Sequence, residues 1–355
     1  MKQPVDLNNK TILVTGSPGF IGAGLVRRLL RELPGGHVIS LDSMNDYYEV
    51  SLKEWRLRQI EADAARSPVR HSFVRGNLAD RALTEEVFER YRPSVVVHLA
   101  AQAGVRYSID HPDAYVESNL IGFFRVLEAC RHFPVEHLVY ASSSSVYGES
   151  REIPFRAENR TDWPVSLYAA TKKSDELMAA VYSRLYRIPA TGLRFFTVYG
   201  PAGRPDMFYY SATKTLSGGG TIRIFNYGNM SRDFTYIDDI VEGIVRVMKA
   251  APTETAGENG LLTPPHALYN IGGGQPVNLL DFVTVLQEEL VRAGVLSDDY
   301  DFEAHRELAE MQPGDVPLTC ADSEPLEREF GFRPGTGIRE GLRNFAEWYK
   351  EYYQL

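Results

Sequence analysis

The chain has 355 residues, of which 44% are hydrophobic and 24% charged, as is typical of a globular protein with a large buried core. The formal net charge of −9 argues against nucleic acid as the main partner, because phosphate backbones bind basic surfaces. The first six residues lack the apolar core of a signal peptide, and no apolar run reaches the ~20 residues that a membrane span needs. Two cysteines, Cys130 and Cys320, and histidines without ligand-like spacing lead us to expect a cytoplasmic protein without a metal site.

The N-terminal segment predicts a strand, a glycine-rich loop and a helix. Residues 11–15 are an apolar, β-branched run, typical of a strand buried on both faces. Gly16, Gly19 and Gly22 follow, and residues 23–30 have helical periodicity. This order brings backbone amides and a helix N-terminus up to a pyrophosphate. The segment therefore predicts a dinucleotide-binding loop.

An acidic residue follows the second predicted strand. Residues 37–41 form that strand, and Asp42 ends it, 20 residues (42 − 22) after Gly22. A carboxylate in this register accepts hydrogen bonds from the adenosine ribose. Because it also repels a 2′-phosphate, the sequence favours NAD over NADP.

The alternation of strands and helices continues to about residue 200. Strands are expected over 69–74, 94–99, 137–140 and 190–195, and helices over 82–90, 112–130 and 168–186. Such alternation predicts an α/β fold with a doubly wound parallel (Rossmann) sheet, in which ligands lie beyond the carboxyl ends of the strands. Small residues at 100–104 would let a cofactor approach the backbone closely.

After residue 200 the pattern changes. We expect residues 1–200 to form the NAD-binding domain and residues 201–355 a smaller α/β substrate-binding domain, partly interleaved with the first. The elements expected there are strands over 221–225 and 269–272, a helix from Asp238, a helix capped by Asn278 and running to Leu290, and two closing helices, the last over 338–353. Residues 251–266 are rich in Pro, Gly, Thr and Glu and should form an exposed excursion.

A tyrosine, a lysine and a serine run provide candidate chemistry. Tyr168 and Lys172 are four residues apart and share one face of the predicted helix. A free phenol ionises near pH ~10, and a neighbouring ammonium stabilises its phenolate. The serines at 142–145 end the preceding strand, where a hydroxyl could share the proton of the same reacting oxygen. This set is suited to removing a proton from an alcohol while a hydride leaves the carbon.

With these motifs placed, the chain resembles the extended short-chain dehydrogenases/reductases. Within them it is similar to the NAD-dependent nucleotide-sugar epimerases, most closely the UDP-glucuronate 4-epimerases. The similarity covers nearly the whole chain. The stretches that carry it are residues 45–48, 51–53, 99–108, 141–148, 167–173, 194–201, 203–207, 232–236 and 312–316. One departure is Ala23-Gly24, where relatives often carry Ser-His.

The resemblance implies residue roles. Tyr168 would be the base at the sugar 4-hydroxyl, Lys172 would bind the nicotinamide ribose, and Ser143 would be the catalytic serine, with Ser145 able to share its role. The other residues implied to hold NAD are Gly16, Gly19, Phe20, Ile21, Gly22, Asp42, Asn45, Asn77, Leu78, Leu99, Ala100, Ala101, Gln102 and Asn119. Those implied to contact the UDP-sugar are Arg106, Ser143, Thr197, Arg204 and Arg232, with Arg232 at the diphosphate and Arg204 at the sugar carboxylate.

The reaction implied is C4 epimerisation of UDP-glucuronate to UDP-galacturonate through a 4-keto intermediate, feeding polysaccharide biosynthesis. UDP-glucose 4-epimerase and UDP-glucuronate decarboxylase remain alternatives on the same scaffold. The dehydratases carry Asp-Glu where this chain has Ser144 and Ser145, so dehydration is not expected. A non-catalytic NAD-sensing protein would have no need of the Ser143, Tyr168 and Lys172 set. The resemblance also implies a homodimer, formed through the helices over 112–130 and 168–186.

Overall fold

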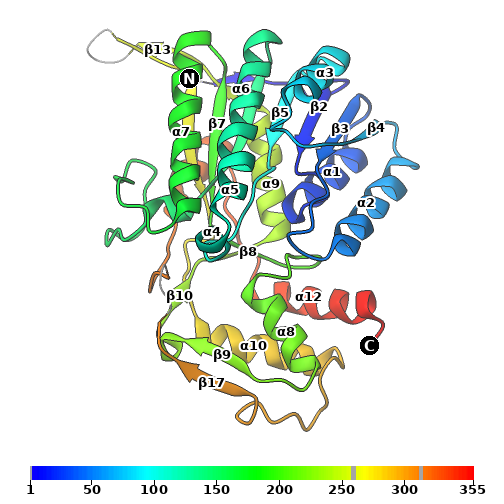
Figure 1. Ribbon diagram of the computed structural model, residues 1–355, viewed down its shortest axis with the longest axis vertical. Helices are drawn as coiled ribbons and strands as arrows, with labels where there is room; N and C mark the ends of the chain where they lie inside the picture. Colours follow the sequence, from blue (N-terminus) through cyan, green and yellow to red (C-terminus); the bar gives the residue numbers. More distant parts are fainter. Residues whose placement is uncertain (1, 257–260, 312–314) are drawn as a thin grey trace.

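The computed structural model describes residues 2–256, 261–311 and 315–355 (Figure 1). Its centre is a seven-stranded sheet in the order β15–β7–β6–β5–β2–β3–β4, in which all neighbours are parallel. The strands are β2 (Thr11–Thr15), β3 (His37–Asp42), β4 (Arg70–Arg75), β5 (Val95–His98), β6 (His137–Ser143), β7 (Ala190–Phe195) and β15 (His266–Ile271). The predicted doubly wound parallel sheet is confirmed.

Helices cover both faces of this sheet (Figure 1). One face carries α1 (Phe20–Glu32), α2 (Val50–Ala64) and α9 (Ile237–Met248), and the other carries α3 (Arg81–Tyr91), α6 (Gly122–His132) and α7 (Leu167–Tyr186). The central strands are mostly apolar, as expected of strands that are buried on both faces. In β2, Ile12 and Val14 join the core on the α1 side, whereas Leu13 joins the core on the α6 side.

A smaller lobe lies beyond the carboxyl ends of the strands (Figure 1). It contains α8 (Phe208–Ser217), α10 (Leu279–Arg292), α12 (Ile338–Tyr353) and the parallel pair β9 (Ile222–Phe225) and β17 (Arg306–Ala309). Asn278 caps α10 as predicted, since its side chain accepts a 2.8 Å hydrogen bond from the Leu280 amide. Two short pairs join the lobes: β8 (Thr197–Tyr199) with β11 (Phe234–Tyr236), and β10 (Ser231–Arg232) with β16 (Val277–Asn278). Helix α11 (Glu324–Phe330) precedes α12.

The single helix expected over 112–130 is wrong in detail. After α4 (Tyr107–Asp110), the chain forms α5 (Pro112–Tyr115), a π-helical stretch (Val116–Ile121) and then α6. Helix α2 was not anticipated at all. Its polar and apolar residues do not segregate clearly, so the sequence gives no strong helical period.

The exposed excursion expected over 251–266 is also partly wrong. β12 (Ala250–Pro252) pairs with β1 (Lys2–Pro4), and Ala251 is 1% exposed. β13 (Thr255–Ala256) pairs with β14 (Leu262–Thr263). Residues 257–260, and residues 312–314 of the last stretch that carries the family resemblance, lie outside the described residues.

Both cysteines are buried and free. Within the described ranges, no helix combines the length and apolar character that crossing a membrane requires. The same ranges hold no group of three or more His, Cys, Asp or Glu side chains placed to bind a metal ion.

Candidate active site

The glycine loop lies between β2 and α1, at the point where the strand order reverses between β2 and β5. Gly16 has φ +71°, and a Cβ there would lie 2.7 Å from the Ala100 amide nitrogen. A Cβ on Gly22 would overlap the Gly16 carbonyl oxygen. Only glycine permits this close turn. Helix α1 begins at Phe20 with Gly19 as an N-cap that offers no side chain, so its first amides can meet an anion.

Asp42 lies at the end of β3, and its Oδ1 accepts a 2.6 Å hydrogen bond from the Met44 amide. Burial raises the pKa of this carboxyl group, although the Met44 amide opposes the shift. Beside it, the buried Lys53 ammonium donates to the backbone and side-chain oxygens of Asn45 at 2.7 and 2.6 Å. Asn45 is therefore fixed by Lys53.

Arg56 connects the glycine loop to the loop that carries Arg204. It is 1% exposed. Its guanidinium donates to the carbonyl oxygens of Pro18 at 3.1 Å, Ala202 at 2.8 Å and Gly203 at 2.8 Å. Sequence reasoning missed Arg56, because bonds to main-chain carbonyls leave no pattern in residue types.

The segment after β5 is held from behind by Asn119. The Asn119 side chain accepts a 2.8 Å bond from the Gln102 amide and donates a 3.0 Å bond to the Gln102 carbonyl oxygen. It also donates to Thr171 on α7 at 3.0 Å. Asn119 is completely buried. Its predicted contact with NAD stays a prediction, but these bonds position the backbone of Gln102.

Asn77 and Leu78 follow β4. The Asn77 amide donates a 2.8 Å bond to Glu117, and its oxygen accepts from the Ala79 amide at 3.0 Å. Leu78 is buried. The Asn77 side chain is thus held in place before any ligand arrives.

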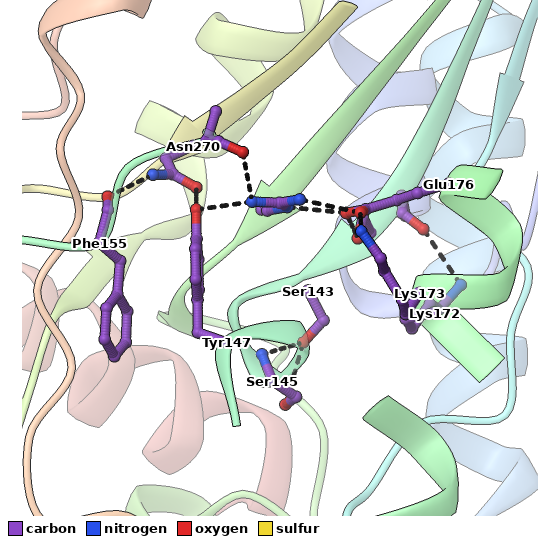
Figure 2. A network of polar contacts seen from close by, with 12 residues as sticks. Ser143, Ser145, Tyr147, Phe155, Lys172, Lys173, Glu176 and Asn270 are labelled. Atoms are coloured by element: carbon purple, nitrogen blue, oxygen red, sulfur yellow. Dashed lines mark hydrogen bonds and ion pairs between the residues drawn. The ribbon is translucent and has the colours of Figure 1, made fainter. Parts of the chain in front are cut away.

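The two candidate serines are linked to each other. Ser143 ends β6, and its Oγ accepts a 3.1 Å bond from the Ser145 amide and donates a 3.1 Å bond to the Ser145 Oγ (Figure 2). Ser145 lies in the 3₁₀ turn Ser144–Tyr147 that follows directly. The hydroxyls form one polar unit, and either can be placed against a ligand oxygen.

Tyr168 and Lys172 lie on the first turns of α7. Ser166 caps this helix by accepting a 3.1 Å bond from the Ala169 amide. Lys172 is 2% exposed, and its ammonium donates to the Ala141 carbonyl oxygen at 3.1 Å and to Asp175 at 3.2 Å. The Ala141 bond joins α7 to the strand that carries Ser143, so the strand and the helix hold the three candidate groups together.

Behind the serines, a buried network fixes the end of β6 (Figure 2). Arg194 on β7 donates to Glu176 on α7 at 2.7 and 2.9 Å and to the Tyr147 hydroxyl at 2.9 Å. Tyr147 donates to Asn270 on β15 at 2.6 Å, and Asn270 donates to the Phe155 carbonyl oxygen at 2.7 Å. Through these hydrogen bonds the network connects the 3₁₀ turn Ser144–Tyr147, called the serine turn below, to β7, β15 and α7.

Arg204 and Asp206 form a forked ion pair on the smaller lobe's side. The guanidinium donates from Nε to Oδ1 at 3.0 Å and from Nη2 to Oδ2 at 2.7 Å. The Tyr47 hydroxyl donates to Oδ2 at 3.1 Å. Burial lowers the pKa of Arg204, but Asp206 more than offsets this and the pKa is raised overall. Sequence reasoning found Arg204 but gave no role to Asp206 or to Tyr47.

Two more arginines face the smaller lobe. Arg106 forms a 3.0 Å salt bridge with Asp315 and lies over the Phe225 ring. Arg232 is half-buried, and burial lowers the pKa of its guanidinium. Asp315 opposes this shift through space. Among the described residues, no carboxylate lies within salt-bridge distance of Arg232. A half-buried cation without a carboxylate in direct contact is suited to bind an anion.

One cavity of about 1040 Å³ joins the parts of the structure that carry the predicted ligand contacts. It is lined by the glycine loop, the ends of β3 and β5, the serine turn, Tyr168 and Lys172, and it continues to Thr197, Arg204 and Arg232. Every predicted site residue lines it except Asn119. The glycine turn, the uncapped N-terminus of α1 and the carboxyl group of Asp42 fit a dinucleotide with an unmodified ribose.

Comparison with known proteins identifies the family. The model of the NAD dependent epimerase/dehydratase family matches residues 12–272. The chain belongs to this family.

Within the NAD dependent epimerase/dehydratase family, similar proteins span almost the same length. Protein CapI of Staphylococcus aureus is 47% identical over 97% of this chain and 99% of its own. A probable UDP-glucuronate 4-epimerase of Rhizobium meliloti is 43% identical over 96% of this chain and 97% of its own. The crystal structure of UDP-glucuronic acid 4-epimerase from Bacillus cereus, in complex with UDP-glucuronic acid and NAD, superposes with a TM-score of 0.82 at 30% identity, covering 97% and 100% of the two chains.

Proposed function

We propose that this protein is a UDP-glucuronate 4-epimerase, an isomerase that uses NAD to interconvert UDP-glucuronate and UDP-galacturonate. The observation that carries the proposal is the single cavity that joins the glycine loop to Tyr168, Lys172 and Ser143 and then to two arginines, Arg204 and Arg232. A dinucleotide and an anionic nucleotide sugar both fit such a site. The names of the relatives from Rhizobium meliloti and Bacillus cereus support the same activity.

Tyr168 and Lys172 carry the proton transfer. The Tyr168 phenolate accepts the proton of the 4-hydroxyl, and C4 becomes a ketone. Bound NAD accepts the hydride from C4 and returns it, so no external redox partner is needed. The Lys172 ammonium stabilises the phenolate, while Ser143, bonded to Ser145, donates a hydrogen bond to the same sugar oxygen.

The sugar must turn between the two halves of the reaction. It rotates about its link to the diphosphate, which stays on the Arg232 guanidinium, and presents its other face to Tyr168. Tyr168 then returns the proton, and the configuration at C4 is inverted. A half-buried arginine that has no carboxylate within salt-bridge distance among the described residues provides an anchor for this rotation.

The carboxylate of the substrate creates a hazard. The 4-keto intermediate is a β-keto acid, which loses CO₂ when its carboxylate bond aligns with the carbonyl π-system. Arg204 and Thr197 hold the carboxylate out of that alignment. Asp206 occupies Nε and Nη2 of the guanidinium, and we assign the Nη1 group to the sugar carboxylate.

The assembly and location are proposed on less specific grounds. Leu177, Val181 and Leu185 recur every four residues on α7 and are 57%, 52% and 62% exposed, a stripe that a second copy would cover. We propose a homodimer in the cytoplasm whose product feeds polysaccharide synthesis. Light scattering should give twice the chain mass of 39.9 kDa, and a monomeric mass would contradict the dimer.

The first test is to incubate the purified protein with UDP-glucuronate, without added NAD, and to follow the anomeric protons by NMR. UDP-galacturonate should form, since NAD is regenerated in each cycle and can remain bound. A UDP-pentose as the main product would identify a decarboxylase instead. Turnover of UDP-glucose but not UDP-glucuronate would identify a UDP-glucose 4-epimerase. Tyr168→Phe should abolish turnover and keep the fold.

Arg204→Ala tests the carboxylate assignment. We expect turnover of UDP-glucuronate to fall at least about 100-fold, the usual effect of losing a charged contact worth about 3 kcal/mol. Turnover of UDP-glucose should fall much less, and the share of UDP-pentose should rise. Equal losses for the two substrates would show that Arg204 does not recognise the carboxylate.

A further inference from the structure

A carboxylate outside the cavity contacts Lys172 from behind. Asp175 lies three residues after Lys172 on α7, and its Oδ2 is 3.2 Å from the Lys172 Nζ. The two side chains are 1% and 2% exposed. Asp175 does not line the cavity. Its direct link to the cavity is its ion pair with Lys172.

This ion pair is incompletely satisfied. The Lys172 ammonium has one further partner in the described structure, the Ala141 carbonyl oxygen at 3.1 Å. The second oxygen of Asp175, Oδ1, is buried and has no hydrogen-bond partner among the described residues. A buried carboxylate with one unpaired oxygen carries a desolvation cost that its single ion pair only partly offsets. A neutral residue could pack there at less cost, so the charge of Asp175 calls for another explanation.

We propose that Asp175 is a positioning residue that holds the Lys172 ammonium and sets how strongly it stabilises the Tyr168 phenolate. The proposal rests on the function proposed above, in which Tyr168 is the base. Lys172 has three N–H groups: Ala141 and Asp175 take two of them, and the third remains for a ligand in the cavity. Asp175 thereby aims the ammonium and also cancels part of its charge.

The surroundings allow Asp175 to change its charge near neutral pH. Asp175 and its neighbours Lys172 and Glu176 face ionisable groups from the adjoining strands and from α7 itself. These groups are His98 on β5, Tyr140 on β6, Arg194 on β7, His266 on β15 and Lys173, which lies 3.5 Å from Glu176. Burial lowers the pKa of His98 to about 3 and that of His266 to about 4, so both imidazoles stay neutral. Arg194 is engaged by Glu176. Burial raises the pKa of Asp175 to about 7, against the opposing effect of Lys172.

The expected direction follows from the charges. When Asp175 is ionised, it keeps Lys172 protonated but weakens the positive field at Tyr168. Asp175→Asn removes the negative charge and keeps the shape. The phenolate of Tyr168 should then form at lower pH, and Lys172, without its counter-ion, should lose its proton at lower pH. Both limbs of the profile of kcat/KM against pH should move in the acidic direction.

The experiment compares the wild type, Asp175→Asn and Glu347→Gln. Glu347 is exposed and pairs with Arg292 in the smaller lobe, so Glu347→Gln changes the net charge equally, far from Lys172. We expect Asp175→Asn to move the kcat/KM profile by at least about half a pH unit and Glu347→Gln to leave it unchanged. A profile of Asp175→Asn that coincides with the wild type would overturn the proposal, even if kcat falls, because a structural role alone lowers rate without moving ionisations.

A second measurement does not depend on the substrate. Phenolate formation is followed by absorbance at 295 nm in Asp175→Asn and in the wild type, each corrected with its Tyr168→Phe counterpart. The Tyr168 signal should form at lower pH in Asp175→Asn, and an unchanged or higher midpoint would overturn the proposal. If Asp175→Asn does not fold, Asp175→Ala is titrated in the same way. Failure of the epimerase assay alongside a shifted Tyr168 signal would reject the proposed function but keep the Asp175–Lys172–Tyr168 coupling.

Discussion

Two carboxylates that are neighbours on α7 are buried in different ways. Glu176 accepts two bonds from Arg194 and a 2.7 Å bond from Ser142, so both of its oxygens are paired. Asp175 is paired through one oxygen to Lys172, and its other oxygen has no hydrogen-bond partner among the described residues. Burial raises the pKa of both groups, but Arg194 reverses the effect at Glu176, whose pKa is lowered, whereas that of Asp175 is raised to about 7.

The difference separates an ion pair that stabilises the fold, Glu176–Arg194, from an ion pair whose charge can change with pH, Lys172–Asp175. A buried ion pair with complete hydrogen bonding is locked, because losing either partner strands a buried charge. Glu176 and Arg194 connect α7 to β6 and β7, and neither side chain lines the cavity. Lys172 lies one helical turn after the candidate base Tyr168, and Asp175 keeps one oxygen without a hydrogen bond among the described residues. The charge of Asp175 can therefore change without breaking the hydrogen bonds between Glu176 and Arg194.

Breaking the Glu176–Arg194 pair should have the largest effect on stability. Glu176→Gln leaves the guanidinium of Arg194 buried without a counter-charge, which typically costs about 3–5 kcal/mol. Urea unfolding followed by circular dichroism measures this loss. Asp175→Asn is the matched control on the adjacent residue and should cost much less. Equal destabilisation by the two substitutions would remove the distinction between the pairs.

Removing the lysine of the Lys172–Asp175 pair should affect activity more than stability. Lys172→Met removes the charge that stabilises the Tyr168 phenolate, so kcat should fall about 100-fold or more, within the range for losing a group that supports acid–base catalysis. The acidic limb of the pH profile should move upward, opposite to the shift expected for Asp175→Asn. NAD should also bind more weakly, as equilibrium dialysis would detect. An acidic limb in the wild-type position would refute the stabilising role of Lys172.

The smallest effect is a difference in how pH changes stability. Because the pKa of Asp175 is raised on folding, its contribution is present below the unfolded value near ~4 and is lost as pH rises toward about 7. Glu176 has a lowered pKa, so its contribution is present above about pH 4 and is lost as pH falls. Urea unfolding at several pH values should therefore show the wild type losing roughly 3 kcal/mol relative to Asp175→Asn between pH ~4 and ~7. The free energy by which the wild type is more stable than Glu176→Gln should become smaller below pH ~4. Parallel curves for all three proteins would contradict the assigned directions.

The contrast also shows what the sequence could and could not predict. The apolar run of β2, the glycine spacing and Asp42 were predictable because each has a fixed place relative to a strand end. Tyr168 and Lys172 followed from helix geometry. Asp175 did not, since an acid three residues after a lysine is common on helices and only burial makes this one unusual.

Contacts between segments that are distant in the chain could not be predicted from the sequence for a related reason. Arg56 bonds to the carbonyls of Ala202 and Gly203, and carbonyl oxygens are the same in every residue. Asp206 accepts two hydrogen bonds from the Arg204 guanidinium, although the sequence indicated a role only for the arginine. The strand near residue 270 was foreseen, but its place beside β7 depends on pairing over more than 70 residues. The division of the chain near residue 200 stays a prediction.

That last pairing has a consequence for how the protein is made. β15 (His266–Ile271) lies at one edge of the seven-stranded sheet, and β7 (Ala190–Phe195) is its one neighbouring strand in the described sheet. During synthesis, β7 leaves the ribosome well before its neighbour exists, and until then it is an open, apolar sheet edge of the kind that recruits other chains. We expect a fragment ending near residue 200 to keep this sheet edge exposed and to aggregate more readily than the full chain.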